Sequence, residues 1–176
     1  MSVGVWKRLA GLWSPKLSPM DHELIESYLD DSGKFLFFQM NRIDQMHSIN
    51  VAKMVIAQAG FIRGLDHHAL VKAALLHDIG KVEGELGLVS RLVAGALRRI
   101  YPTGRNKLGI QSRKPMLGKI RYGFYVDLIH PVRGSHMAKI FGVEDRVVEL
   151  IRHHHDPPRK DQEAELTWLQ LADSRN

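Results

Sequence analysis

The sequence of 176 residues contains no cysteine and no long apolar run. The absence of cysteine excludes disulfide bonds and thiolate metal sites, so any metal ligands must be histidine nitrogens or carboxylate oxygens. No segment approaches the roughly 20 consecutive apolar residues that a membrane-spanning helix needs. The N-terminus also lacks the uninterrupted apolar core of a signal peptide. These absences predict a cytoplasmic globular protein.

Acidic residues are missing from one long segment, between Arg91 and Arg121, which holds nine lysines and arginines. The rest of the chain has 16 basic and 19 acidic residues, so the net charge of +6 arises in this segment. A basic insert confined to about 91–121 predicts a local anion site rather than a surface that binds nucleic acid generally.

Apolar residues recur at helical spacing along most of the chain, and the alternating pattern of a strand is scarce. We expect helices over about 18–30, 42–59, 66–78, 86–100, 131–141, 145–154 and 163–173. Ser32-Gly33 is expected to break the first helix and Pro131 to open the fifth, with a basic loop or short helix over 107–121. With 44% hydrophobic residues, the pattern predicts an all-α fold, a single compact helical bundle over 19–176.

The first 18 residues form a separate N-terminal segment in this interpretation. Trp6, Leu9 and Trp13 recur at helical spacing and are accompanied by basic residues. This pattern is compatible with an amphipathic helix on a membrane surface or with a tail that packs on the domain. We favour the helix or tail that packs on the domain.

Candidate metal ligands border apolar helices at several points of this chain, which has ten histidines. The pair His77-Asp78 ends an apolar run, and Lys81 follows it. A buried polar group without a partner is costly, and metal ligation removes that cost. Other candidates occupy similar borders: His47, His130, His154, His155 and Asp173. Nitrogen and oxygen donors without sulfur suit Fe, Mn, Co, Ni, Zn or Mg.

The order of these residues resembles the HD-domain metal-dependent phosphohydrolases over roughly 42–176. His47, the His77-Asp78 pair and Asp173 match the H…HD…D pattern of that superfamily. The strings LLHDIGK, HPVRG, IRHHH and LAD are similar to its HDIG-type branch. The chain resembles the HD-type diadenosine tetraphosphate hydrolases and HD-GYP-related phosphodiesterases. It lacks the glycine-tyrosine-proline motif, which argues against cyclic di-GMP as the substrate.

The resemblance implies an HD-domain helical bundle that hydrolyses a phosphoester or phosphoanhydride of a nucleotide or dinucleotide. Two divalent metal ions would activate the attacking water. The first would be held by His47, His77, Asp78 and Asp173. The second would be held by His130, His154 and His155, with Asp78 bridging the two ions. Asp78 and Lys81 would be the catalytic residues, with Lys81 beside the phosphate.

General metal chemistry agrees with this expectation. Two cations about 3.5–4 Å apart can share a water and lower its pKa to about 7, so that hydroxide is available at neutral pH. A lysine can stabilise charge on the phosphoryl group. Such a reaction needs no side-chain nucleophile, which suits a chain without cysteine.

Each candidate ligand also has a plainer interpretation. His77 could be a protonated histidine at a helix C-terminus, and His47 a hydrogen-bonded core residue. His130 could simply precede a proline, and Asp173 could be solvated near the end of the chain. Adjacent helix positions differ by about 100°, so the three histidines of 153–155 cannot share one face, and the resemblance leaves His153 outside the site.

Two other functions fit parts of the sequence. A regulator could sense a nucleotide in the same pocket without turnover, and a binder of nucleic acid or of an anionic surface could use the basic insert. We expect a small-molecule partner, no nucleic acid and, at most, peripheral membrane contact. The candidate phosphate contacts are Arg98, Arg105, Arg113, Lys114 and Arg133.

Overall fold

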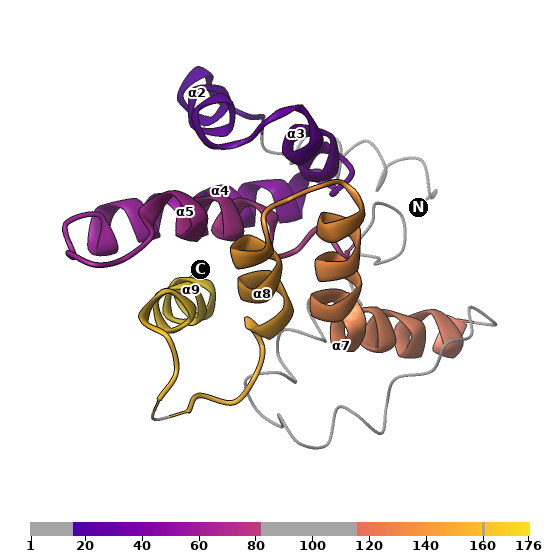
Figure 1. The fold of residues 1–176 in the computed structure, drawn as a ribbon. Coiled ribbons are helices and arrows are strands. Elements are labelled where there is room, and N and C mark those ends of the chain that lie inside the picture. Colours follow the sequence, from indigo (N-terminus) through magenta and orange to yellow (C-terminus); the bar gives the residue numbers. More distant parts are fainter. Residues whose placement is uncertain (1–15, 82–115, 160) are drawn as a thin grey trace.

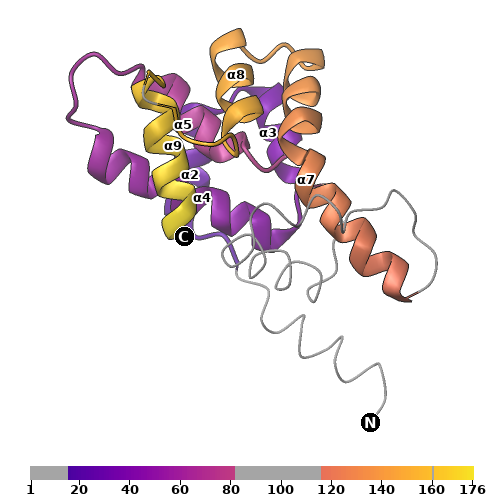
Figure 2. The ribbon, with the colours of Figure 1, turned by 90° about the horizontal axis from the view of Figure 1, so that it is seen from below.

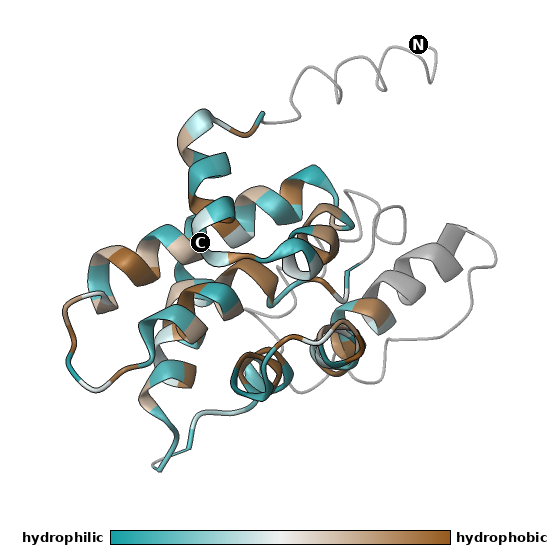
Figure 3. Ribbon diagram, turned by 45° about the horizontal axis from the view of Figure 1, so that its top comes forward, coloured by the Kyte–Doolittle hydropathy of each residue, from teal (hydrophilic) through white to brown (hydrophobic). Residues whose placement is uncertain are grey.

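The computed structural model describes residues 16–81, 116–159 and 161–176. Within these ranges the regular elements are all helices, so the predicted all-α fold is confirmed (Figure 1). Hydrophilic and hydrophobic residues alternate along the ribbons, as expected for helices with one buried side (Figure 3). The elements are α2 (Pro19–Tyr28), α3 (Asp31–Phe38), α4 (Arg42–Ala59), α5 (His67–Leu76), α7 (Met116–Ile140), α8 (Asp145–His153) and α9 (Ala164–Arg175).

Helix α5 is the centre of the bundle. It pairs with α4 through the turn at 60–66, and α2, α3, α8 and α9 also pack against it (Figures 1 and 2). Every residue from Ala69 to Leu76 is buried, which accounts for the apolar run in the sequence. Burial of each leucine in this run contributes about 1.5–3 kcal/mol to stability. The run therefore carries the His77-Asp78 pair into the interior.

The two N-terminal helices begin with side-chain caps. Ser18 and Asp21 form a reciprocal capping box at the start of α2, with proline at its first position. The expectation that Ser32-Gly33 breaks this helix is wrong. The break lies at Leu29-Asp30, where Asp30 turns the chain and accepts a hydrogen bond from the N–H of Gly33. The cap at Asp30 starts α3, and Ser32 and Gly33 therefore lie in the first turn of this helix.

A buried lysine joins three of the helices. The Nζ atom of Lys72 on α5 lies 3.2 Å from Asp30 and 2.8 Å from Glu144, the residues that precede α3 and α8. Its side chain is 6% exposed, whereas both carboxylates reach solvent. The lysine charge is therefore paired although it is buried, and the starts of α3 and α8 are held against α5.

Helix α7 also departs from expectation. Pro131 does not open a helix but lies inside one that begins at Met116, so the end of the expected basic loop, 116–121, is helical. Proline cannot donate a hydrogen bond to the carbonyl four residues earlier, that of Asp127. The Nδ1 atom of His130 donates to this carbonyl instead, at 2.7 Å. The helix bends along its length but continues (Figures 1 and 2).

Helices α8 and α9 agree with the expected ranges to within two residues. The buried face of α8 consists of Val147, Val148, Leu150 and Ile151, while Leu169 and Ala172 anchor α9. Among the described residues, no helix has the length and apolar character that crossing a membrane requires. Residues 1–15 and 82–115 lie outside the described residues, and with them the N-terminal pattern around Trp6 and Trp13, the expected helix over 86–100 and most of the basic insert.

Candidate metal centre

The seven predicted metal ligands converge from five segments. His47 comes from the middle of α4, His77 and Asp78 from the end of α5, and His130 from the middle of α7. The remaining ligands follow the last turn of α8 or lie near the end of α9: His154, His155 and Asp173. Their donor atoms form three groups, each within 4.8 Å, which share His77 and His154. The groups are His47, His77 and Asp173; His77, Asp78 and His154; and His130, His154 and His155.

Contacts between the side chains link the groups into one cluster. Asp173 lies 2.9 Å from Nε2 of His47, 3.6 Å from Nε2 of His77 and 3.4 Å from Nε2 of His155. Asp78 lies 3.1 Å from Nε2 of His130. The imidazole rings also contact one another in tilted or edge-to-face arrangements, with centroids 4.1–5.3 Å apart. Both carboxylates also approach Nε2 of His77, so this histidine connects the two sets of contacts.

Three of these histidines share one orientation, in which Nδ1 bonds to the backbone. His77, His130 and His154 each contact the carbonyl three residues earlier, at 2.7–2.9 Å. A carbonyl can only accept a hydrogen bond, so Nδ1 must carry the proton in each ring. In the neutral ring, Nε2 then presents a lone pair to the cluster. Metal-binding histidines characteristically have this arrangement, in which a second hydrogen bond fixes the ring.

Burial keeps two of the three rings neutral. It lowers the pKa of His130 to about 3, with Lys81 adding to the effect. Burial also lowers the pKa of His154 well below its ordinary value, helped by His155 and His77. The Nε2 atoms of His130 and His154 are 3.2 Å apart. Because both Nδ1 protons are used by carbonyls, two lone pairs face each other across this distance, an arrangement that a cation between them would stabilise.

Both carboxylates favour their ionised form, and their negative charges raise the pKa of His77. Burial opposes ionisation of Asp78, but Lys81 and then His77 hold its pKa well below the usual range. Burial likewise opposes ionisation of Asp173, and contacts with His155, His47 and His77 lower its pKa well below the usual range. Burial opposes protonation of His77, yet the charges of Asp78 and Asp173 raise its pKa. The cluster therefore attracts positive charge.

Lys81 supplies one positive charge directly to Asp78. Its Nζ atom lies 2.7 Å from Oδ1 and 2.8 Å from Oδ2 of that carboxylate, and the lysine is 8% exposed. The side chains are three residues apart in the turn that follows α5. Lys81 is thus at the edge of the cluster, within reach of a group bound beside Asp78.

Gly80 allows the turn after α5 to approach α7 closely. A Cβ atom at this position would lie 2.1 Å from the carbonyl oxygen of His130. A Cβ atom at Gly134 would lie 3.2 Å from the backbone nitrogen of Gly80. The turn after α5 therefore packs directly against the backbone of α7. This close approach brings Asp78 to His130.

The donor set fits a metal ion on structural grounds. The Nε2 atom of His77 is completely buried and has no hydrogen-bond partner, and its nearest carboxylate oxygens are 3.6 and 3.7 Å away. An unpaired buried nitrogen is costly, and ligation would satisfy it. Imidazole nitrogens with carboxylate oxygens suit divalent ions of the first transition row. All seven predicted ligands belong to groups whose donor atoms lie close enough together to hold such an ion.

The predicted phosphate contacts are only partly described. Arg133 is half-buried on α7, one turn after His130. The other four lie in the segment outside the described residues: Arg98, Arg105, Arg113 and Lys114. Pro131 and Gly80 shape the site without being among the predicted site residues. The signal for Pro131 was a proline directly after a candidate ligand.

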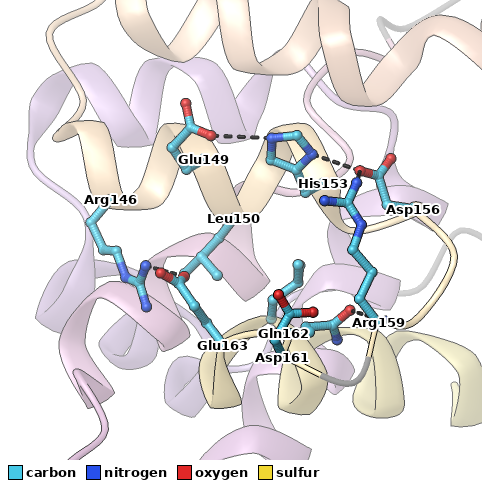
Figure 4. Close-up of a pocket in the computed structure, with 10 residues that line it drawn as sticks. Arg146, Glu149, Leu150, His153, Asp156, Arg159, Asp161, Gln162 and Glu163 are labelled. Atoms are coloured by element: carbon cyan, nitrogen blue, oxygen red, sulfur yellow. Dashed lines mark hydrogen bonds and ion pairs between the residues drawn. The ribbon is translucent and has the colours of Figure 1, made fainter.

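His153 lies outside the cluster, as expected, and borders a separate surface hollow of about 290 Å³ (Figure 4). Its Nδ1 atom lies 2.7 Å from Asp156 and its Nε2 atom 3.1 Å from Glu149. Arg159 also contacts Asp156, and Arg146 contacts Glu163. Because these charges pair with one another across the rim, the hollow does not present a cluster of like charges to a ligand.

Comparison with known proteins finds no match: no family model, curated protein or solved structure is similar to this chain at the level required. The resemblance to the HD-domain phosphohydrolases therefore stays a prediction based on sequence motifs. The functional argument below uses the cluster itself.

Proposed function

We propose that this protein is a metal-dependent phosphohydrolase that acts on a phosphoester or phosphoanhydride of a nucleotide or dinucleotide. The observation that supports it best is the orientation of His77, His130 and His154. Each donates its Nδ1 proton to a backbone carbonyl and leaves Nε2 in the cluster that contains Asp78 and Asp173. Buried Nε2 atoms that either lack a hydrogen-bond partner, as in His77, or face each other, as in His130 and His154, are expected of ligands and are costly in an ordinary core.

The ligands would be divided between two ions. His47, His77 and Asp173 would hold the first, and His130, His154 and His155 the second. Asp78 lies between the groups, in contact with His130 and 3.7 Å from Nε2 of His77, and would serve both. When bound, divalent ions supply an activated water and neutralise phosphate oxygens.

Lys81 completes the proposed chemistry. Its ammonium contacts Asp78 at the edge of the cluster. From there it can turn toward a phosphate oxygen, where it would stabilise developing negative charge. Asp78 would orient the attacking water. The nucleotide specificity of the proposal comes from the sequence resemblance and from the basic insert between Arg91 and Arg121.

The decisive experiment compares Asp78→Asn with Asp156→Asn, the same substitution at the surface hollow. The wild-type protein would be purified, analysed for metal and assayed with diadenosine tetraphosphate, cyclic dinucleotides, guanosine alarmones and mononucleotides. Each assay would compare Mn, Fe, Co, Ni, Zn and Mg. We expect turnover to fall by at least about 100-fold in Asp78→Asn and to be unchanged in Asp156→Asn. Circular dichroism would verify that both variants are folded.

Wild-type turnover in folded Asp78→Asn protein would contradict the two-metal assignment. Tight nucleotide binding without turnover in metal-loaded wild type would instead support the sensing regulator. Salt-sensitive binding to oligonucleotides or anionic liposomes that survives loss of His77 would support the anionic-surface binder.

A further inference from the structure

The three inward-facing histidines use backbone carbonyls of two kinds. His77 bonds to the carbonyl of Ala74 and His154 to that of Ile151. Both carbonyls lie in the last turn of a helix, α5 or α8. Carbonyls in a last turn have no helical N–H donor, so they are open to a side chain. The ends of α5 and α8 therefore provide acceptors for these two rings without any special residue.

His130 is different because it lies in the interior of α7. The carbonyl that it contacts belongs to Asp127 and would normally accept from the N–H of residue 131. Residue 131 is proline, which has no N–H and whose ring displaces the carbonyl four residues earlier. The proline thus removes a backbone donor in the middle of a helix, and His130 donates to the Asp127 carbonyl as His77 and His154 donate to carbonyls at helix ends.

We propose that Pro131 is a positioning residue for the metal ligand His130. Because it supplies no N–H to the Asp127 carbonyl, this carbonyl accepts the Nδ1 proton of His130, and Nε2 is directed toward Asp78 and His154, at 3.1 and 3.2 Å. The inference rests on the proposed function for its purpose, but the tautomer that it specifies is a property of the protein alone.

The close approach at Gly80 supports this role. The carbonyl of His130 lies where a side chain at residue 80 would be, so the backbone of α7 is in contact with the turn after α5 at this point. The ring of His130 is fully buried. Because the backbone is fixed there, the direction of Nε2 depends on the hydrogen bond at Nδ1. A residue with an N–H at 131 would close the helix around the Asp127 carbonyl and draw it away from the ring.

The test is the variant Pro131→Ala, with Val132→Ala as the matched control. Val132 is the next residue of α7 and is 45% exposed, so its truncation leaves the Asp127 carbonyl unchanged. Long-range proton–nitrogen NMR of the metal-free protein would report the tautomer of each histidine. We expect Nδ1–H for His130 in wild type and Val132→Ala, and an increased Nε2–H population in Pro131→Ala. His77 and His154 should keep Nδ1–H in all three, which verifies that the site is folded.

Zinc titration by calorimetry provides the second measurement. We expect Pro131→Ala to bind zinc roughly 10- to 100-fold more weakly than wild type and Val132→Ala to bind it equally well. An Nε2–H tautomer of His130 in wild type would overturn the inference. So would a Pro131→Ala protein in which either the tautomer or the zinc affinity equals that of wild type. If wild type binds no zinc but shows the expected tautomers, the metal proposal fails and the tautomer assignment stands.

Discussion

Two neighbouring residues of this protein, His153 and His154, belong to regions with similar side chains but different burial, the surface hollow and the buried cluster. His153 is half-exposed and lies between Glu149 and Asp156 at the surface hollow. His154 is 2% exposed and faces other histidines. Both regions combine imidazoles with carboxylates. They differ in whether each imidazole nitrogen has a hydrogen-bond partner.

This difference separates a surface ion-pair network from a candidate metal centre. At the hollow, each imidazole nitrogen of His153 already has a carboxylate partner, so no cation is required there. In the cluster, a buried Nε2 atom of His77 has no hydrogen-bond partner, and those of His130 and His154 face each other. Buried nitrogens without a hydrogen-bond partner are costly, and this cost favours metal binding.

The largest expected effect would come from exchanging the two histidines separately for glutamine. His154→Gln removes a donor shared by two of the ligand groups, so we expect the affinity for zinc or manganese to fall by more than about 100-fold. His153→Gln should leave this affinity within about twofold of wild type, since a surface residue contributes no ligand. Isothermal titration calorimetry would measure both. Equal losses in the two variants would remove the distinction between the regions.

A smaller effect is expected from pH on the metal-free protein. The pKa of His130 is lowered to about 3 and that of His154 is also lowered, so below about pH 6.5 the unfolded chain binds protons that the folded cluster excludes. Stability should therefore decrease as the pH falls. The raised pKa of His77 acts in the opposite direction and offsets part of the loss. We expect a net loss of about 1–2 kcal/mol between pH 7.5 and 5.5.

Urea unfolding in a chelator, followed by tryptophan fluorescence at the two pH values, measures this loss. Asp78 and Asp173 do not contribute within this window because their pKa values are lowered from 3.8. A free energy of unfolding that is equal at both pH values, or larger at pH 5.5, would show that the buried histidines accept protons in the folded state.

The smallest effect is expected at the hollow. Glu149→Gln removes the charge of a carboxylate that is 61% exposed and contacts His153. Surface pairs of this kind contribute little, so the free energy of unfolding should change by no more than about 0.5 kcal/mol. Thermal unfolding at two salt concentrations would measure it. A change above about 2 kcal/mol would mean that the hollow is energetically coupled to the buried core.

Helical periodicity allowed most helices to be predicted from the sequence, because the apolar residues of α4, α5, α8 and α9 face a single core. Helix starts with side-chain caps, such as Ser18 and Asp66, were also predictable, since capping is local. The failures at Ser32-Gly33 and Pro131 have a common cause. Glycine and proline both weaken isolated helices, and the predictions relied on this preference. In the structure the cap at Asp30 outweighs it at Gly33, and the hydrogen bond from His130 outweighs it at Pro131.

The candidate ligands could be named from the sequence because an imidazole or carboxylate beside an apolar segment must be satisfied in the interior. Their number, order and chemical type follow from the residues alone. The sequence could not show that Asp173 reaches His47 across 126 positions, or that His130 faces His154 rather than solvent. Those contacts depend on how α7, α8 and α9 pack around α5, with Gly80 permitting the closest approach.

The amino-acid order thus specified the helices, the absence of sulfur ligands and the identity of the donors, because these depend on local periodicity and side-chain chemistry. The packing of the helices specified the grouping of the candidate ligands and the proton positions on three rings. These properties depend on distances between distant segments and on which backbone carbonyls accept from the rings, here those of Ala74, Asp127 and Ile151.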